Sequence, residues 1–371
     1  MAGRASIIWL RVLLAFLFAT GFYFGVIGIA YADFYPEPNP PVLEPTELYK
    51  PREKGILAPS AAPTTEWINH KSGDGSHPDG NEQKMMWLMN RARKNPTAEG
   101  IWLAESTHPD IKGGRDYFGV DTVELKNAFA AISPKPPAAF DARLYNASKD
   151  HSLYMIAHDT QTHEGQYDKV IASGFQCNGA RLSIFGYADS ALNAHAALNI
   201  DWGYDTDDGM QDPPGHRYAI MDVDVAPLEG VKLANVGLAL VAENDPETKV
   251  GPLVFSGAYC QGGTEEFNRF IVGTVWRDQN ANSEYDSGEG LSGVTVMPDK
   301  GTYYAVTGNA GGYAIAITSP GSYTVTFSGE KISSDVIKTV QIGDDSVLVD
   351  LLYAPEPSRP MPWIPLLLLD E

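Results

Sequence analysis

The fold of this chain is indicated most clearly by two stretches, Gln161-Thr162-His163-Glu164-Gly165 and Pro213-Pro214-Gly215-His216-Arg217-Tyr218-Ala219-Ile220-Met221. Each histidine follows a segment with the apolar spacing of an amphipathic helix, so we expect each imidazole at a helix end that faces a cleft. Two imidazoles in one cleft can hold a divalent metal or transfer protons near neutral pH. Spacing alone equally allows two unrelated histidines, so the surrounding sequence has to decide.

The first 32 residues have the form of a secretory signal peptide. Arg4 and Arg11 flank a short polar start, an apolar run covers residues 12–29, and Ala30-Tyr31-Ala32 offers a cleavage site. The apolar run is also long enough for an uncleaved anchor, but the small residues at its end favour cleavage before Asp33. We therefore expect a secreted or cell-surface protein, with the periplasm as an alternative and no stable membrane span after cleavage.

The chain is strongly acidic, with a formal net charge of −20 over 371 residues. The predicted signal peptide contains two arginines and no acidic residue, so the mature chain is more acidic still. Nucleic acid and anionic lipid surfaces repel such a chain, and we expect no nucleic-acid partner. Calcium, basic partners and neutral ligands fit this charge better.

The only two cysteines are Cys177 and Cys260. An exported protein meets oxidising surroundings, which favours one disulfide between them over two free, buried thiols. In the chain-entropy model, a disulfide closing a loop of this size contributes roughly 4–5 kcal/mol to stability.

Composition divides the chain into segments. Residues 33–80 are rich in proline and without apolar periodicity, which predicts an extended linker. Helical spacing from residue 81, after Asp141 and over 188–202 is followed by strand-like runs at 234–241 and 252–259. This order predicts a mixed α+β domain over 81–262.

From residue 263 the sequence changes to short β runs separated by Gly, Pro, Asn or Asp. These runs predict a small all-β sandwich over 263–353, followed by a Pro-rich tail at 354–371. The predicted strands cover residues 271–276, 294–297, 303–307, 313–317, 323–327, 338–342 and 347–352.

The loop Asp278–Glu289 has the spacing of a calcium-binding loop. Oxygen-bearing side chains stand at positions 1, 3, 5, 9 and 12, and position 7 offers a backbone carbonyl, as in an EF-hand loop. Ser283 replaces the usual glycine at position 6. An exposed polar turn is the alternative, but five donors in register favour calcium. The predicted ligands are Asp278, Asn280, Asn282, Glu284, Asp286 and Glu289.

The same region resembles a known family. The stretches Gly273-Thr274-Val275-Trp276-Arg277-Asp278 and Gly288-Glu289-Gly290-Leu291-Ser292-Gly293-Val294-Thr295-Val296 resemble the SdrD B-like family. This family consists of immunoglobulin-like, generally calcium-stabilised modules of bacterial surface proteins. The resemblance covers roughly residues 270–353 and implies a spacer or display role.

Five stretches of the histidine-containing segment carry a second resemblance. They are Asn90–Glu99, His151–Met155, Thr162–Gly165, Gly215–Met221 and Asn235–Leu240. In this order they resemble bacterial members of the CAP superfamily, which carry the SCP domain and include cysteine-rich secretory, antigen-five and pathogenesis-related proteins. The resemblance implies an α-β-α sandwich with one cleft that holds His163 and His216.

One position departs from that family. Its cleft usually contains a glutamate from an Ala-Glu-Asn-Ile-like motif, and the matching segment here, Gly179–Gly186, has Arg181 at that position. A guanidinium beside two imidazoles disfavours both zinc or another divalent metal and imidazolium formation. It suits an anionic or carbonyl-bearing ligand instead.

These features favour a binding or interaction module for a lipid, glycan or protein ligand, with the β-sandwich as a calcium-stabilised spacer. The alternative is an extracellular, protease-like hydrolase, metal-dependent or acid–base, which uses His163, His216 and a carboxylate from residues 205–212. A structural component of a surface or matrix is a further alternative. Arg181 weighs against an enzyme, so no catalytic residue is assigned.

Overall fold

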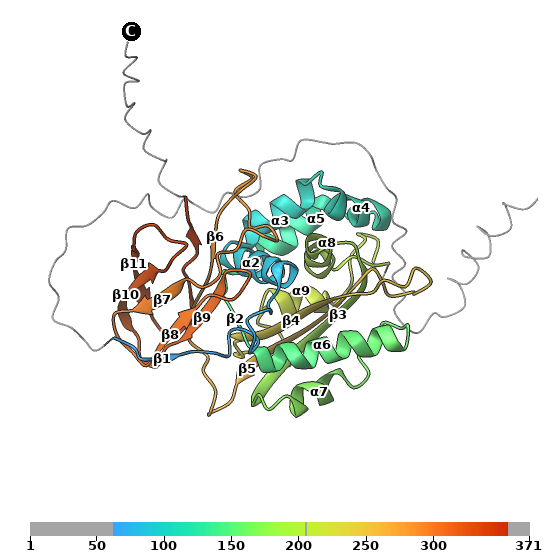
Figure 1. Ribbon diagram of the computed structural model, residues 1–371. Coiled ribbons are helices and arrows are strands. Elements are labelled where there is room, and N and C mark those ends of the chain that lie inside the picture. The colour runs from blue at the N-terminus through green and yellow to red at the C-terminus, as the bar shows by residue number, and fades with distance from the viewer. Residues whose placement is uncertain (1–61, 205, 355–371) are drawn as a thin grey trace, which may run out of the picture.

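The computed structural model describes residues 62–204 and 206–354. The predicted signal peptide, most of the predicted linker and nearly all of the tail lie outside these residues. Figure 1 shows two parts side by side, one built of helices around a sheet and one of strands alone. Helices and strands occur together, which confirms the α+β class. No helix in the described part of the chain has the length and apolar character needed to cross a bilayer.

The first part is a mixed four-stranded sheet with helices on both faces. The strand order is β2-β4-β5-β3, with β2 and β4 parallel and the other pairs antiparallel. The strands are β2 (Ala139–Phe140), β3 (Cys177–Ala188), β4 (Asn235–Ala242) and β5 (Leu253–Gly262). The helices are α2 (Gly80–Lys94), α3 (Pro96–Glu105), α4 (Pro109–Phe118), α5 (Thr122–Ala130), α6 (Ala142–Ala157), α7 (Gln166–Ala172), α8 (Ala191–Ala196), the π-helical turn η1 (Ala197–Asp201) and α9 (Gly215–Ile220).

Alternation along β4 explains the layers. Val236 and Leu238 are buried with the residues of α2 on one face of the sheet, while α6 covers the other face (Figure 1). A Cβ atom at Gly237 would lie 2.1 Å from the backbone of Leu144 and Tyr145, so glycine is required where α6 crosses β4. Ser148 secures this crossing because its hydroxyl donates to the Gly237 carbonyl at 2.8 Å.

Local signals located several elements correctly. Asp141 caps α6 as predicted, and the helix predicted from residue 81 is α2, which begins with a capping box formed by Asp79 and Glu82. The predicted strands at 234–241 and 252–259 are β4 and β5, and the predicted helix at 188–202 is α8 followed by η1. The edge strand β3 and the helices α3, α4 and α5 were not predicted.

The second part contains all the predicted β runs as strands. They are β6 (Phe270–Trp276), β7 (Thr295–Pro298), β8 (Tyr303–Val306), β9 (Gly312–Ala316), β10 (Gly321–Ser328), β11 (Val336–Ile342), β12 (Val347–Leu348) and β13 (Leu351–Leu352). One sheet has the order β1-β8-β7-β10-β11, and in the other β6 pairs with β9, β12 and β13. Residues of both sheets, such as Ile271 and Val325, share one buried cluster.

The end of the predicted linker differs from the extended chain expected for it. Residues 65–66 form β1, which pairs in parallel with β8 of the second part. Trp67 packs edge-on against Phe267 and Tyr303, with ring centroids 5.2 and 5.0 Å apart. The buried His70 ring lies 3.0 Å from the Val306 carbonyl oxygen. Strand pairing and aromatic packing therefore hold residues 65–70 against the protein.

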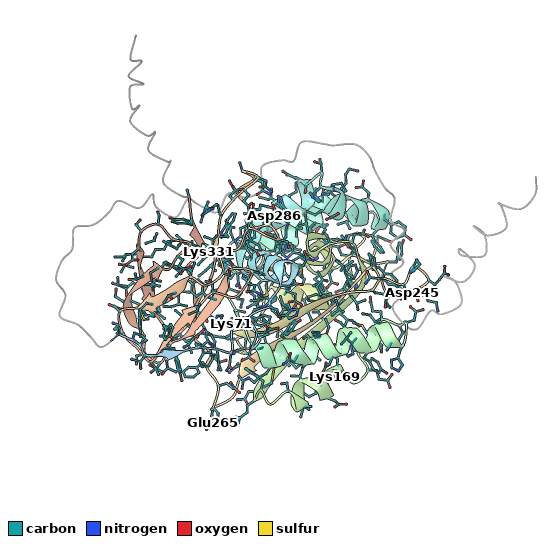
Figure 2. The ribbon with its side chains drawn as sticks, viewed as in Figure 1. Lys71, Lys169, Asp245, Glu265, Asp286 and Lys331 are labelled. Carbon is teal, nitrogen blue, oxygen red and sulfur yellow. A yellow bond between two sulfur atoms is a disulfide. The ribbon has the colours of Figure 1, made fainter. Side chains whose placement is uncertain are left out.

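A buried ion network joins the two parts. The Arg91 guanidinium of α2 donates to both carboxylate oxygens of Glu99 at 2.9 and 3.0 Å. It also donates at 2.7 Å to Glu284, which belongs to the loop after β6. Figure 2 labels a neighbouring loop residue, Asp286, where the two parts meet, and its carboxylate contacts Lys84 at 2.5 Å. Two cations of α2 thus bind two anions of one loop in the second part.

Charge pairing outweighs desolvation in this network. Burial by itself would lower the pKa of Arg91, but the carboxylates of Glu99 and Glu284 raise it above its usual value. Burial opposes ionisation of Glu99, yet Arg91 and the hydrogen bond from His195 hold the pKa of Glu99 below its usual value. Arg91 and Glu99 therefore stay charged at neutral pH.

We predict that Arg91→Met strongly destabilises the protein. The change leaves Glu99 and Glu284 buried without their counter-ion, which costs about 3–5 kcal/mol. Lys112→Met is the matched control, because Lys112 pairs with Asp116 on the exposed face of α4 and such pairs contribute at most about 1 kcal/mol. Urea unfolding at pH 7 measures both variants, and equal small losses would contradict the prediction.

Candidate binding cleft

An open cleft of about 720 Å³ lies beside the free edge of β3. Residues 159–163, part of β3 and residues 211–216 line it. His163, Arg181 and His216, which the sequence predicted as cleft residues, all belong to this lining. The structure therefore places the three predicted side chains in one cleft.

His163 is held by one buried amide. It lies in the loop before α7, six residues beyond the end of α6, and not at a helix end as expected. Its Nδ1 is 2.7 Å from Oε1 of Gln166. The Gln166 Nε2 donates to the Ser183 carbonyl at 3.1 Å and to Ser256 Oγ at 2.9 Å, so the amide oxygen must face His163. Nδ1 therefore carries the proton, and Nε2 keeps its lone pair.

His216 is oriented by a carboxylate. It lies in the first turn of α9, and its Nδ1 is 2.7 Å from Oδ1 of Asp201. The other oxygen of this buried carboxylate accepts the backbone N–H groups of His216 at 2.8 Å and Arg217 at 3.2 Å. Asp201 adopts a left-handed conformation, with φ of 56°, at the end of η1. Non-glycine residues in this conformation often occur at functional sites.

The two imidazoles bind their buried partners through the same ring nitrogen. In each, Nδ1 is used by a buried partner, and no described residue forms a hydrogen bond with Nε2 of His163 or His216. Burial lowers the pKa of His163, and the nearby His216 lowers it further, while the bond to Gln166 opposes both. His163 is therefore neutral at pH 7, with its lone pair available for a ligand.

Arg181 and Lys249 are the cations of the cleft lining, and Lys249 Nζ lies 3.7 Å from the Asp159 carboxylate. The Arg181 Nη2 donates to the Val225 carbonyl at 3.0 Å, and the Arg181 guanidinium lies 5.7 Å from the centre of the Tyr218 ring. Within the described residues, no carboxylate lies within salt-bridge distance of Arg181. The cleft thus combines a cation without an anionic partner and two imidazoles whose Nε2 atoms have no hydrogen-bond partner among the described residues.

The sequence analysis did not identify the two residues that orient the cleft histidines. The hydrolase alternative expected a carboxylate from residues 205–212, and Asp212 does line the cleft, but the carboxylate that contacts His216 is Asp201. Gln166 was missed as the partner of His163. The three-residue spacing from His163 to Gln166 was available in the sequence, whereas only the fold brings Asp201 near His216.

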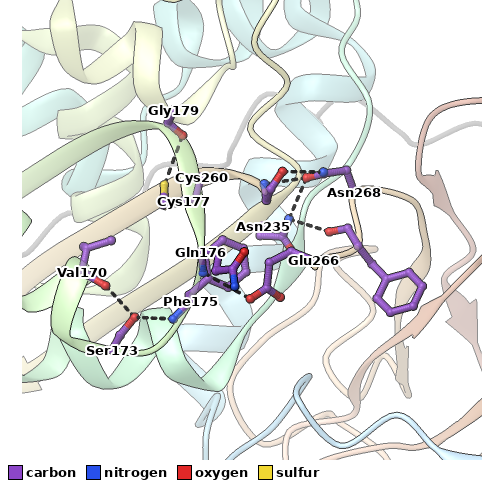
Figure 3. Close-up of a disulfide and its surroundings, with 12 residues drawn as sticks. Val170, Ser173, Phe175, Gln176, Cys177, Gly179, Asn235, Cys260, Glu266 and Asn268 are labelled. Carbon is purple, nitrogen blue, oxygen red and sulfur yellow. Dashed lines mark hydrogen bonds between the residues drawn. A yellow bond between two sulfur atoms is a disulfide. The ribbon is translucent and has the colours of Figure 1, made fainter. Parts of the chain in front are cut away.

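The disulfide between Cys177 and Cys260 confirms the predicted pairing, with Cα atoms 5.6 Å apart. It joins the first residue of β3 to β5, so it fixes the strand that lines the cleft. Figure 3 shows polar contacts beside it, among them the N–H of Gln176, which donates to Glu266 at 3.2 Å. Covalent and polar links thus anchor the start of β3.

The loop 278–289 is ordered by its own side chains. Asp278 accepts the N–H groups of Asn282 at 3.2 Å and Ser283 at 2.9 Å. Glu289 accepts those of Gln279 at 2.8 Å and Asp286 at 2.9 Å. No three carboxylates of this fully described loop converge on one point. Among the described residues, three side chains that could together hold a metal ion lie close to one another only at His77, Asp79 and Glu82. Asp79 and Glu82 already form the cap of α2.

Comparison with known proteins gives no assignment, since no protein-family profile and no curated protein match this chain. The chemistry of the cleft is therefore inferred from its geometry.

We predict that His163 titrates below the usual histidine pKa of about 6.5. His216→Ala should raise the pKa of His163, because it removes a nearby positive charge. Since the folded-state pKa lies below the unfolded one, the contribution of His163 to stability is complete above pH 6.5 and is lost as the pH falls. NMR titration of the imidazole signals tests this.

The control is His158→Ala, which replaces a histidine outside the cleft lining. It should leave the titration of His163 unchanged. A His163 pKa at or above 6.5, or equal shifts in the two variants, would contradict the assigned environment.

Proposed function

We propose that the protein is an exported binding module of the bacterial CAP type, and that its ligand binds in the cleft formed by His163, Arg181 and His216. The proposal is supported chiefly by one observation: two imidazoles, each oriented by a buried partner, line a single large cleft. The resemblance of the stretches around both histidines to the CAP superfamily supports it independently, and the apparent signal peptide supports export.

The chemistry of the cleft limits the ligand. The neutral imidazole of His163 accepts a hydrogen bond at Nε2, so the ligand offers a hydroxyl or N–H donor there. Arg181 attracts a carboxylate or a carbonyl oxygen. Leu182 and Ile184 add apolar surface between these polar groups. A lipid, glycan or protein segment with mixed polar and apolar character satisfies these conditions.

A hydrolase is the second candidate because of the Asp201–His216 pair. A buried carboxylate that accepts the Nδ1 proton of a histidine is the arrangement of a general base. His216 would then take a proton from water through Nε2. In a metal-dependent version, His163 and His216 would hold zinc, but the positive charge of Arg181 opposes this.

The cleft proposal predicts ligand-dependent stabilisation that requires the histidines. The mature chain is melted with a soluble oligosaccharide mixture, a short-chain phospholipid and a set of short peptides. A ligand at 100 times its Kd adds about 2.7 kcal/mol to stability. At least one class should stabilise the wild type and His158→Ala, but not the variant with both His163→Ala and His216→Ala.

Two outcomes would overturn the binding-module proposal. One is the absence of any stabilisation that distinguishes the double variant from wild type. The other is stoichiometric zinc that disappears in both single-histidine variants and is accompanied by peptide-bond hydrolysis, which would favour the hydrolase.

We also propose that the loop 278–289 binds calcium and stabilises the second part. Its donors are all oxygens, as calcium prefers. Ser283 adopts a left-handed conformation, with φ of 64°, at the position where calcium loops usually have glycine. Glu284 directs its side chain to Arg91, which leaves its backbone carbonyl as the donor for position 7. Asp278, Asn280, Asn282, Asp286 and Glu289 would supply the remaining ligands.

The calcium proposal predicts that Glu289→Ala abolishes stabilisation by calcium. The wild-type chain should melt at a higher temperature in calcium than in chelator, because the ion binds only the folded loop. Glu289→Ala should melt at the same temperature in both, although it also loses two backbone hydrogen bonds. Glu330→Ala, an exposed change outside the loop, is the control. Equal melting of the wild type in calcium and chelator would contradict the proposal.

A further inference from the structure

The strand β3 has one free edge. It is the last strand of its sheet and pairs with β5 alone. Arg181 and Leu182 lie on opposite faces of this strand, yet both line the cleft. The cleft therefore runs along the edge of β3 and not over one face of the sheet. Leu182 and Ala180 pack their side chains with the cluster beneath α6 and α7.

The position of Gln166 determines which backbone groups point outward. Its Nε2 lies 3.1 Å from the Ser183 carbonyl oxygen and 3.4 Å from that of Gly257, the residue opposite Ser183 on β5. One nitrogen can reach both oxygens only if both point into the space between the strands. Ser183 and Gly257 therefore form a hydrogen-bonded pair of the antiparallel ladder.

Because this pattern alternates, the N–H and C=O groups of Ala180, Leu182 and Ile184 point away from β5. These three residues line the cleft. Farther along the strand, the outward N–H of Gly186 donates to the Gln161 side chain at 2.7 Å. At Leu182 and Ile184, no described residue outside the sheet bonds to these groups. A row of free donors and acceptors therefore faces the cleft.

We propose that the cleft binds an extended peptide segment of a partner protein, which adds a strand to the free edge of β3 and places one acidic residue at Arg181. This inference rests on the proposed function and names its ligand. Alternate residues of an extended chain repeat their N–H and C=O groups at the spacing of a β-strand, which matches the edge of β3. Sugars and lipids have no such repeat.

The charges around the edge indicate the chemistry of the peptide. Arg181 offers a guanidinium with no carboxylate partner among the described residues, so it binds an acidic side chain of the added strand. His163 presents an Nε2 acceptor in the same cleft, which suits a threonine or serine hydroxyl. The partner segment is therefore extended, free of proline at its paired positions, and acidic near Arg181.

The test uses a fluorescent peptide of alternating threonine and valine with one central glutamate, titrated into the mature chain. Leu182→Pro removes one outward N–H and leaves the β3–β5 bonds in place, because proline is tolerated at the free side of an edge strand. We expect it to weaken binding at least tenfold. Leu182→Thr keeps the N–H and should change affinity less than threefold.

Two further arms define the contacts. The same peptide with every backbone nitrogen methylated should not bind, since it lacks all donors. Replacing its glutamate with glutamine should weaken binding to the wild type but not to Arg181→Gln. Melting temperature and the intact disulfide confirm that each variant is folded.

The peptide inference would be overturned by no binding at 1 mM, by equal affinity of the two Leu182 variants, or by undiminished binding of the methylated peptide. Binding only after deletion of residues 33–61 would also overturn it, because the chain's own segment would then be the occupant. If a sugar or lipid binds through the histidines and the peptide does not, the inference fails while the binding-module proposal stands.

Discussion

The ion pairs of the Arg91 guanidinium are the interaction on which the packing of the two parts depends. The guanidinium binds Glu99 of α3 and Glu284 of the second part. Without Arg91, both buried carboxylates would lack a counter-ion. Glu99 in turn accepts a hydrogen bond from His195 of α8 at 2.8 Å. Since α8 continues into η1, which ends at Asp201, the network supports the element that orients His216.

The cleft lies along β3, the edge strand of one sheet. A disulfide anchors the start of β3, and Gln166 bridges β3 and β5 while it holds His163. The same amide therefore fixes an imidazole and marks the direction of the neighbouring backbone groups. Rigid support of this kind keeps polar groups oriented before a ligand arrives, which reduces the entropy that binding costs.

Residues with strong local signals were predictable. Helical spacing from residue 81, Asp141 as an N-cap and the strand-like run at 234–241 located elements of the first part. The runs after residue 270 located the strands of the second. By contrast, β3 was missed although Ala180-Arg181-Leu182-Ser183-Ile184 alternates apolar and polar residues, the pattern of a half-buried strand. The anchoring of residues 65–70 was missed because strand pairing and aromatic packing involve residues more than 200 positions away.

The sequence by itself determined the α+β class, the disulfide pairing and the identity of three residues that line the cleft, because spacing, cysteine count and local motifs are properties of the chain. Only the tertiary structure decided that Asp201 orients His216 and that Gln166 orients His163. It alone decided that Glu284 binds Arg91 instead of solvent. The physical reason is that hydrogen bonds and buried ion pairs depend on distance in space, which sequence separation does not give.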